Sequence, residues 1–323
     1  GRLMRVGLDV GGTKTDAVAV DDAGAIVARV RLATGWGPEA VAQVVTDAVD
    51  ALAREGADIA AMRSVGVGMP GQVEPGTTRV LHAVNLGVAE LDLAAVLEPV
   101  LGVPVGVEND VKAAALGAFA LHADTSAVSR DVASPLISGD AMAYLNLGTG
   151  IAAGIVVDGE LWRGGRGAAG EVGHISVDPQ GPRCRCGQRG CIEALAGGAA
   201  IAERWGRPGA LPIRDVFDAA DAGDPLARRL RSELAAGVAA AVRVLVLTVD
   251  VDAVMLGGGI TALADRLLAD VTAELSASAG ASPFLRSLHL AQRVVLLPSG
   301  SPAAALGAAL IGARRAGDRA TSR

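Results

Sequence analysis

The sequence predicts an α/β fold built from two related halves. Strand-like apolar runs alternate with helix-like runs along most of the 323 residues, which is the pattern of α/β proteins. Two segments also resemble each other, Leu8–Thr13 (LDVGGT) and Leu145–Gly150 (LNLGTG). Each is an apolar strand that runs into a glycine-containing turn and a second strand, which indicates an internal repeat. A chain of this length can bury two hydrophobic cores.

In the first half, the expected elements follow from apolar spacing and turn residues. Strands are expected at 4–10, 15–20, 25–32, 64–69 and 103–107, and helices at 38–54, 91–101 and 110 to about 120. Asp21–Gly24 (DDAG) is a hairpin signal between the second and third of these strands. Helix 38–54 is predicted because apolar residues recur on one face, namely Val41, Val44, Val45, Ala48 and Leu52.

The second half repeats this strand and helix alternation. Strands are expected at 143–147, 152–157, 253–256 and 294–297, and helices at 225–247, 261–278 and 302–315. The polar and irregular segment 124–140 is interpreted as a linker or flexible loop. The predicted domains are 1–121, completed by a C-terminal helix at about 302–323, and 122–301, which includes the cysteine-rich loop.

Composition excludes several classes of protein. The net charge of −6 provides no electrostatic footprint for nucleic acid. The most apolar stretch, about 234–256, is interrupted by Arg243, Asp250 and Asp252, so a membrane span is not expected. No signal-peptide pattern precedes the first strand, and the cysteines suit a reducing compartment. We therefore expect a cytoplasmic protein.

A cysteine cluster predicts a metal site. Cys184, Cys186 and Cys191 are the protein's three cysteines and follow His174 closely. Three thiolates and one imidazole form a complete tetrahedral set for Zn²⁺, and four protein ligands leave no open position, so the metal is expected to be structural. This argues against a zinc hydrolase, which needs an open position. The alternative is a set of unrelated buried cysteines.

Three glycine segments are candidate phosphate and nucleotide contacts. They are Gly11, Gly12, Thr13 and Lys14; Gly148, Thr149 and Gly150; and Gly257, Gly258 and Gly259. Glycine lets backbone N–H groups approach phosphate oxygens, and threonine adds hydroxyl donors. Asp9 is a candidate ligand for the Mg²⁺ of a nucleotide, directly or through water. The alternative is that these are ordinary turns, since none is a Walker loop.

Asp110 is the candidate catalytic base. The segment Val105–Asp110 (VGVEND) leads from a strand into a helix. Asp110 could accept a proton from an attacking sugar hydroxyl, because phosphoryl transfer depends mainly on positioning and charge stabilisation. The alternative is that the Asn109–Asp110 pair only caps the helix, which is the commonest role of such residues.

Together these motifs resemble the ROK family (repressors, open reading frames and kinases) of the hexokinase-actin superfamily. The resemblance rests on DVGGTK at 9–14, GMPG at 68–71, END at 108–110, GTG at 148–150, EVGH at 171–174, CRCGQRGCIE at 184–193 and GGGI at 257–260. It implies two actin-like (hexokinase or ribonuclease H-like) domains with an interdomain cleft for ATP–Mg²⁺ and a sugar. It also implies a homodimer or a dimer of dimers.

The resemblance further implies roles for individual residues. Asp110 corresponds to the catalytic base. The sugar-side positions are Gly71, Asn85, Asn109, Asp110, Glu171, His174 and Glu193. His174 would face the sugar with one ring nitrogen and the metal with the other. The tryptophan that often follows the Asn85-Leu86 element is Val88 here, which leaves the identity of the sugar open.

The leading hypothesis is therefore ATP- and Mg²⁺-dependent phosphorylation of a hexose at the 6-hydroxyl, as in glucokinases or N-acetylhexosamine kinases. The alternative is a sugar-responsive transcriptional regulator of the same family whose DNA-binding domain is absent from this chain. Asp110 favours the enzyme, because regulators of this family often lose catalytic residues. ATP or polyphosphate as the donor remains open, as does the size of the oligomer.

Overall fold

The computed structural model describes residues 3–128 and 141–321, which divide into two compact units. Of these residues, the first unit holds those within Gly1–Asp131, Glu160–Ala169 and Pro302–Arg323. The second unit holds those within Val132–Gly159 and Gly170–Ser301. Segment 160–169 thus joins the first unit, whereas the domain prediction placed it in the second.

The first unit is built on a sheet with strand order β3-β2-β1-β4-β8. The strands are β1 (Met4–Val10), β2 (Lys14–Asp21), β3 (Ile26–Ala33), β4 (Met62–Met69) and β8 (Val105–Asn109). β1, β2 and β3 form an antiparallel meander, while β1, β4 and β8 run parallel. The carboxyl ends of β1, β4 and β8 therefore lie at one edge of this sheet.

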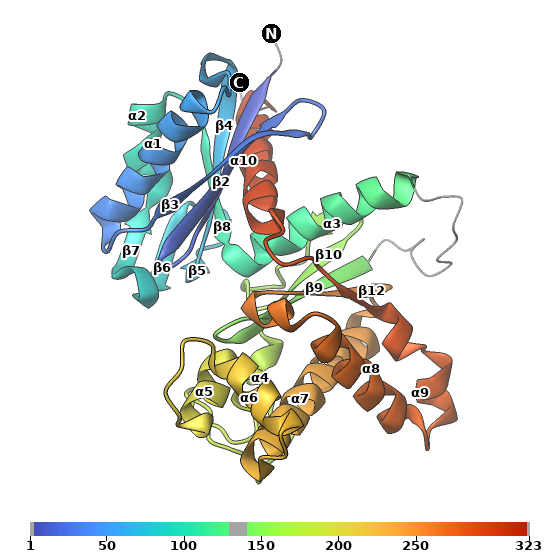
Figure 1. The fold of residues 1–323 in the computed structure, drawn as a ribbon. Helices are drawn as coiled ribbons and strands as arrows, with labels where there is room; N and C mark the ends of the chain where they lie inside the picture. The colour runs from blue at the N-terminus through green and yellow to red at the C-terminus, as the bar shows by residue number, and fades with distance from the viewer. Residues whose placement is uncertain (1–2, 129–140, 322–323) are drawn as a thin grey trace. The chain divides into compact units, whose positions relative to one another are not determined.

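Helices cover both faces of the sheet (Figure 1). They are α1 (Pro38–Arg54) and α2 (Leu93–Leu101) on one face, and α3 (Asp110–Val128) and α10 (Ala303–Thr321) on the other. β2 shows how the sequence encodes this layering. Ala17 and Ala19 belong to the same buried cluster as α1 and α2, whereas Val18 and Val20 pack with α10. This alternation is the period of two expected for a strand buried on both faces.

Glycines let α10 approach both the sheet and α3. A Cβ atom at Gly66 of β4 would lie 1.6 Å from the carbonyl oxygen of Ala308. A Cβ at Gly307 of α10 would lie 1.7 Å from the carbonyl oxygen of Ala113, and one at Gly117 would meet Ala303 in the same way. Backbone atoms on both sides leave no room for a side chain, so these contacts require glycine.

Gly307→Ala should therefore destabilise the first unit. One methyl group would force α10 and α3 apart, and overpacking of this kind costs about 1–3 kcal/mol of unfolding free energy or more. The measurement is thermal or denaturant unfolding. Gly317→Ala is the matched control on the same helix, because a Cβ there meets nothing within 4 Å. It should be neutral or slightly stabilising, so equal losses in both variants would contradict the packing argument.

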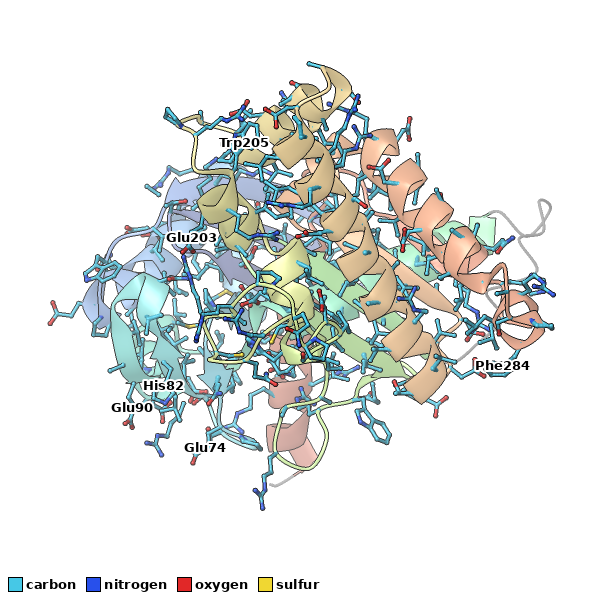
Figure 2. All side chains as sticks on the ribbon, turned by 90° about the horizontal axis from the view of Figure 1, so that it is seen from below. Glu74, His82, Glu90, Glu203, Trp205 and Phe284 are labelled. Atoms are coloured by element: carbon cyan, nitrogen blue, oxygen red, sulfur yellow. The ribbon has the colours of Figure 1, made fainter. Side chains whose placement is uncertain are left out.

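A small antiparallel sheet, which the sequence did not predict, follows β4. It consists of β5 (Gln72–Val73), β6 (Arg79–Ala83) and β7 (Val88–Asp92). His82 of β6, Glu90 of β7 and Glu74, which directly follows β5, are labelled in Figure 2. β7 occupies the start of the predicted helix 91–101. That helix begins only at Leu93, because the side chain of Asp92 caps it by accepting a hydrogen bond from the N–H of Ala95.

The sheet strands that belong to the second unit lie in the order β10-β9-β12-β13. These strands are β9 (Ala141–Leu147), β10 (Ile151–Val157), β12 (Ala253–Gly257) and β13 (Val294–Leu296). β9 and β10 form an antiparallel hairpin like that of β1 and β2, and β12 is parallel to both β9 and β13. The helices are α4 (Ile192–Ala196), α5 (Gly198–Trp205), α6 (Pro212–Asp221), α7 (Pro225–Val249), α8 (Asp265–Ala279) and α9 (Pro283–Ser287).

Helix α7 is a core element. Among the described residues it is the helix that is long and apolar enough to cross a membrane by length and composition. More than half of its most apolar window is buried inside the protein, and Leu230, Leu234 and Val238 lie in the main core of the second unit. Burial within the protein explains its apolar character.

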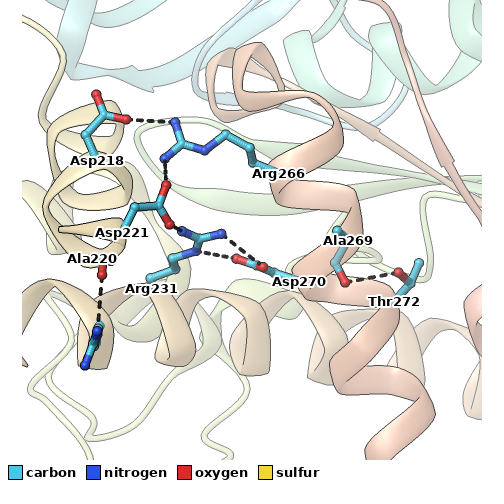
Figure 3. Close-up of polar contacts among 9 residues, drawn as sticks. Asp218, Ala220, Asp221, Arg231, Arg266, Ala269, Asp270 and Thr272 are labelled. Carbon is cyan, nitrogen blue, oxygen red and sulfur yellow. Dashed lines mark hydrogen bonds and ion pairs between the residues drawn. The ribbon is translucent and has the colours of Figure 1, made fainter. Parts of the chain in front are cut away.

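An ion-pair network joins α6, α7 and α8 (Figure 3). Arg231 of α7 contacts Asp270 and Asp221, each at 2.7 Å, and Arg266 of α8 bonds to Asp221 at 2.8 Å. Arg231 also lies 4.4 Å from the ring centre of the buried Phe217. The network therefore fastens three helices at one partly exposed seam of the second unit.

The structure corrects three further element boundaries. Helix α3 continues to Val128, so the predicted linker cannot begin at residue 124; the rest of that segment, 129–140, lies outside the described residues. The predicted domain boundary after residue 121 falls inside this helix. The predicted helix 261–278 is divided at Ala264, whose φ of 47° separates a 3-10 turn, Gly259–Leu263, from α8.

Candidate functional site

The carboxylates of Asp9 and Asp110 lie at the carboxyl edge of the first unit's sheet because of the strand register. Asp9 of β1 lies opposite Gly68 of β4, and Gly68 lies opposite Glu108 of β8. Asp110 follows two residues after Glu108 and begins α3. A Cβ at Gly68 would lie 3.6 Å from the Cα of Asp110. The glycine in β4 therefore leaves space beside Asp110, between the ends of β1 and β8.

Burial raises the pKa of Asp9 from its ordinary value of 3.8 to about 7, and the neighbouring carboxylates of Asp110 and Asp16 add to the shift. Asp16 is already paired with Arg29, which donates from Nε at 2.9 Å. Asp9 and Asp110 are therefore a like-charged pair in a partly buried site. A divalent cation would relieve their repulsion, so the donor set fits the Mg²⁺ that accompanies a nucleotide.

Asp9→Asn should stabilise the nucleotide-free protein, and more so at pH 8 than at pH 5. A carboxyl whose folded pKa is raised favours the protonated state, so its cost begins as the pH rises above 3.8 and is complete above about 7. The full shift corresponds to at most about 4 kcal/mol. Melting temperatures without divalent cations test this, with exposed Asp22→Asn as control. An equal effect at both pH values would contradict the shift.

Asn109, and not Asp110, supplies the side-chain cap of α3. The Oδ1 atom of Asn109 accepts hydrogen bonds from the N–H groups of Val111 at 3.0 Å and Lys112 at 3.3 Å. Its Nδ2 atom donates to the carbonyl of Gly71 at 2.9 Å. The sequence allowed the Asn109–Asp110 pair to be only a helix cap; in the structure most of the capping falls on Asn109, although the Asp110 carboxylate also accepts from Val111 at 2.9 Å.

An ion pair between a buried carboxylate and a half-exposed arginine fixes this corner and was not predicted. Glu108 is only 5% exposed, and its Oε2 accepts from the Nε and the terminal guanidinium nitrogen of Arg163 at 2.8 and 2.7 Å. Its Oε1 accepts from the Asn109 N–H at 2.9 Å. A single acidic residue in an otherwise apolar strand was a visible signal for Glu108. Arg163 had none, because the contact spans 55 positions in the sequence.

The glycine turn after β1 contacts the segment around Asn85. The turn closes with a hydrogen bond from the Gly11 N–H to the Lys14 carbonyl at 2.9 Å. Gly12 and Thr13 are exposed, and a Cβ at Gly12 would lie 3.4 Å from the carbonyl oxygen of Asn85. The predicted phosphate turn and the predicted sugar contact Asn85 are therefore direct neighbours within the first unit.

In the second unit, Glu193 lies against the other predicted phosphate turn. Its Oε2 atom accepts from the N–H of Ile151 at 2.9 Å and would lie 2.6 Å from a Cβ at Gly150. The same turn offers its Gly148 and Thr149 carbonyls to the first N–H groups of α5. Glu193 thus stabilises the backbone of this turn through a hydrogen bond. Its contact with a sugar remains a prediction.

The third glycine segment adjoins the turn at 148–150. Gly258 has a φ of 91°, and a Cβ there would lie 2.6 Å from the carbonyl oxygen of Leu147. A Cβ at Gly257 would collide with the ring of Tyr144 at 2.3 Å. Gly259 has open space around its Cβ position. The first two glycines are thus needed for close packing, and the third presents unobstructed backbone.

The predicted metal ligands meet in one loop. The ligand atoms of His174, Cys184, Cys186 and Cys191 all lie within 4.8 Å of one another. Cys186 Sγ is 3.6 Å from Cys191 Sγ, and Cys184 Sγ is 4.0 Å from His174 Nδ1. A tetrahedral zinc site with Zn–S bonds of about 2.3 Å has S···S edges of about 3.8 Å. The sulfur spacing is far too long for a disulfide bond.

The electrostatics of the loop also fit a cation. Hydrogen bonds from Gln188 lower the pKa of Cys186, whereas burial and the neighbouring sulfurs raise the pKa of Cys191. Ionisation of Cys191 beside the other sulfurs is therefore unfavourable unless a positive charge lies between them. Gln188, which the sequence did not single out, donates from Nε2 to the His174 carbonyl at 2.9 Å and to the Cys186 and Cys191 sulfurs at 3.4 and 3.5 Å. Its position between two predicted ligands was the available signal.

The predicted sugar contacts are distributed over both units. Gly71, Asn85, Asn109 and Asp110 belong to the first, and Glu171, His174 and Glu193 to the second. Within the second unit, a Cβ at Gly173 would lie 2.0 Å from the carbonyl oxygen of Ile151, so the segment before the metal loop packs on the turn that Glu193 holds. Glu171 and His174 are exposed. The convergence of both groups on one cleft stays a prediction.

Comparison with known proteins identifies the group to which this chain belongs. The sequence profile described as "ROK family" matches residues 5–315, so the chain is a member of the ROK family. It is 32% identical to a glucokinase from Halalkalibacterium halodurans over 295 residues, which cover 85% of this chain and 86% of that one. It is 31% identical to an N-acetylmannosamine kinase from Yersinia pseudotuberculosis, over 78% of this chain and 82% of the other.

A solved structure supports the same assignment. The ROK family glucokinase from Streptomyces griseus, determined in complex with glucose and AMPPNP, is 29% identical and superposes with a TM-score of 0.73. The match covers 96% of this chain and 99% of that one. The predicted α/β architecture of two actin-like halves is thereby confirmed.

Proposed function

We propose that this protein is a sugar kinase that transfers the terminal phosphoryl group of ATP, with Mg²⁺, to the 6-hydroxyl of a hexose or an N-acylated hexosamine. The observation that carries the proposal is the carboxylate pair, Asp9 and Asp110, at the carboxyl edge of one sheet beside a glycine turn. Asp9 suits the binding of a cation, and Asp110 suits the acceptance of a proton. The named relatives, a glucokinase and an N-acetylmannosamine kinase, support the substrate class.

In this proposal Asp110 accepts the proton of the attacking hydroxyl. Its position at the start of α3 favours the charged carboxylate, so proton transfer occurs late, which suits phosphoryl transfer. Asn109 and the Glu108–Arg163 pair fix the backbone around it. Asp9 would hold Mg²⁺, directly or through water, and the bound ion would supply neutralisation of phosphate charge.

The remaining predicted residues complete the proposal. The phosphates would bind at the two glycine turns, formed by Gly11, Gly12, Thr13 and Lys14 and by Gly148, Thr149 and Gly150. The N–H groups of Gly11 and Gly148 close these turns, so the other turn residues would supply the donors. The sugar and base of the nucleotide would bind at Gly257, Gly258 and Gly259. The hydroxyls of the acceptor sugar bind at Gly71, Asn85, Asn109, Glu171, His174 and Glu193. The nucleotide analogue in the Streptomyces griseus structure supports ATP as the donor.

The cluster of His174 and three cysteines would hold a structural Zn²⁺. His174 presents Nδ1 to the cluster, which leaves Nε2 available for the sugar. The metal would therefore set the orientation of a substrate contact without acting as a Lewis acid. We further propose a cytoplasmic homodimer or dimer of dimers, consistent with the free thiols of the described residues.

The test is a coupled assay of ADP release with MgATP across glucose, mannose, fructose, N-acetylglucosamine and N-acetylmannosamine. We expect turnover of at least one sugar, with ³¹P–¹³C NMR assigning the new phosphate to C6. The 6-deoxy form of the best sugar is the matched control and should give no turnover. Polyphosphate in place of ATP tests the donor. If the intact protein phosphorylates no sugar but still binds one, the alternative of a sugar-responsive regulator is favoured.

A further inference from the structure

The loop before α1 carries an exposed tryptophan beside the predicted sugar contact Asn85. Gly35-Trp36-Gly37 leads into the helix, and Trp36 is 72% exposed. The Gly37 N–H donates to the Leu86 carbonyl at 2.7 Å, which fastens this loop to the Asn85-Leu86 segment. The tryptophan is therefore held at a defined place while its side chain remains open to solvent.

The absence of a side chain at Gly87 leaves space for the indole ring of Trp36. Gly87 has a φ of 68°, and a Cβ there would lie 2.5 Å from both Nε1 and Cε2 of Trp36. Any other residue at position 87 would displace the indole. By contrast, Val88 is buried in the core of the first unit at 1% exposure. The aromatic surface beside Asn85 is therefore supplied from a distant point in the sequence.

Asn85 connects Trp36 to the predicted phosphate turn. The carbonyl oxygen and Cβ of Asn85 would lie 3.4 and 3.8 Å from a Cβ at Gly12. On its other side, Asn85 is two residues from Gly87, on which the indole packs. Asn85 thus separates the phosphate turn from the tryptophan, and a ligand held at Asn85 next to the phosphates would extend toward the indole.

The chemistry of the indole indicates what it would contact. Asn85 and Gly87 are two residues apart, a span of at most about 7 Å. A hydroxyl on a sugar bound at Asn85 is too short to cross this distance, whereas an acylamino substituent extends most of the way. The indole offers an apolar face to an acyl methyl group. Its N–H has no hydrogen-bond partner among the residues that the structure describes, so it is available to an acyl carbonyl.

We propose that Trp36 is a specificity-determining residue that contacts the N-acyl substituent of the acceptor and makes an N-acylated hexosamine the preferred substrate over the parent hexose. This inference rests on the proposed sugar kinase function, because it takes Asn85 as a sugar contact. It adds a residue and a preference that none of the sequence motifs contains.

The test compares kcat/KM for N-acetylglucosamine and N-acetylmannosamine with that for glucose and mannose. Trp36→Ala should lower the preference for the acylated sugar by about tenfold or more, the usual effect of one apolar contact in a substrate pocket. Trp36→Phe, which keeps an apolar ring but lacks the N–H, should retain part of this preference. Trp162→Phe is the matched control, since Trp162 is another exposed tryptophan of the first unit at 57% exposure, and it should leave the ratio unchanged.

Tryptophan fluorescence provides a readout that does not depend on turnover. Titration with the acylated sugar should change the emission of the Trp162→Phe variant but not that of Trp36→Phe, while Trp205 stays buried at 5% exposure in both. Loss of the response in Trp36→Phe supports the contact.

The outcomes separate this inference from the proposed function. A protein that phosphorylates glucose and prefers it over the acylated sugars, or in which Trp36→Ala changes both classes equally, overturns the role of Trp36 and leaves the kinase intact. A protein that phosphorylates nothing, but whose Trp36 emission responds to N-acylhexosamine, retains the contact and loses the kinase. Absence of both turnover and response overturns both.

Discussion

Asp110→Asn should reduce kcat by about 10²–10⁴-fold, the usual effect of removing a general base. The asparagine keeps the shape of the side chain but cannot accept the proton of the sugar hydroxyl. Stability should hardly change, because Asn109 still caps α3. Removal of one of two repelling carboxylates also compensates for the lost favourable interaction with the helix dipole, which is worth about 0.3–1 kcal/mol. Steady-state kinetics and a melting curve on the same preparation test both statements.

Two variants make this result interpretable. Asp58→Asn removes an exposed carboxylate elsewhere in the first unit and should leave kcat unchanged. Asn109→Ala should instead lower stability, since loss of a helix cap costs about 0.5–2 kcal/mol. Activity of Asp110→Asn within threefold of the parent would reject Asp110 as the base. A fall in activity accompanied by an equal fall in melting temperature would point to a structural role.

Cys191→Ser should release the metal and strongly destabilise the second unit. Structural zinc contributes apparent binding free energies of about 10–16 kcal/mol in zinc-finger peptides. Even about 4 kcal/mol of this would lower the melting temperature by about 8–16 °C for a unit of this size. Cys191 is fully buried and packs beside Cys184 and Ala194, so the loop would lose its anchor next to α4. Metal analysis and thermal unfolding measure the two effects.

Arg185→Ala is the control in the same loop. Arg185 is largely exposed and its ion pair with Glu203 is long, at 3.5 Å, so both metal content and stability should be retained. Glu203 itself lies on the exposed side of α5 (Figure 2). A Cys191→Ser protein that loses metal and activity but melts like the parent would contradict a structural metal and favour a catalytic one.

Local sequence patterns predicted much of the fold. Helix 38–54 has the predicted bounds because its apolar spacing and Pro38 at its start agree. The strand pairs around the two glycine turns were also predicted, since each alternates or is wholly apolar. The small sheet β5-β6-β7 was not, because its strands are only two to five residues long and give little alternating pattern. The division at Ala264 depends on a backbone conformation that alanine rarely adopts.

The candidate site was predicted to the extent that its residues are neighbours in the chain. The metal cluster is the clearest case, since its ligands lie between residues 174 and 191 and come within 4.8 Å of one another. Contacts between distant positions left no pattern. The Glu108–Arg163 pair and the packing of Trp36 on Gly87 arise only once the chain has folded. The residues of these two contacts could therefore not be predicted, because their partners are distant in the sequence.

The place of α10 in the chain has a consequence for synthesis on the ribosome. This helix covers one face of the first unit's sheet, yet it follows the whole second unit in sequence. The surface of β4 that carries Gly66 is therefore synthesised early. It stays uncovered by α10 while more than half of the polypeptide is translated. Co-translational folding can complete the second unit first, and a nascent chain that stalls before Ala303 would display an unfinished sheet to chaperones and proteases.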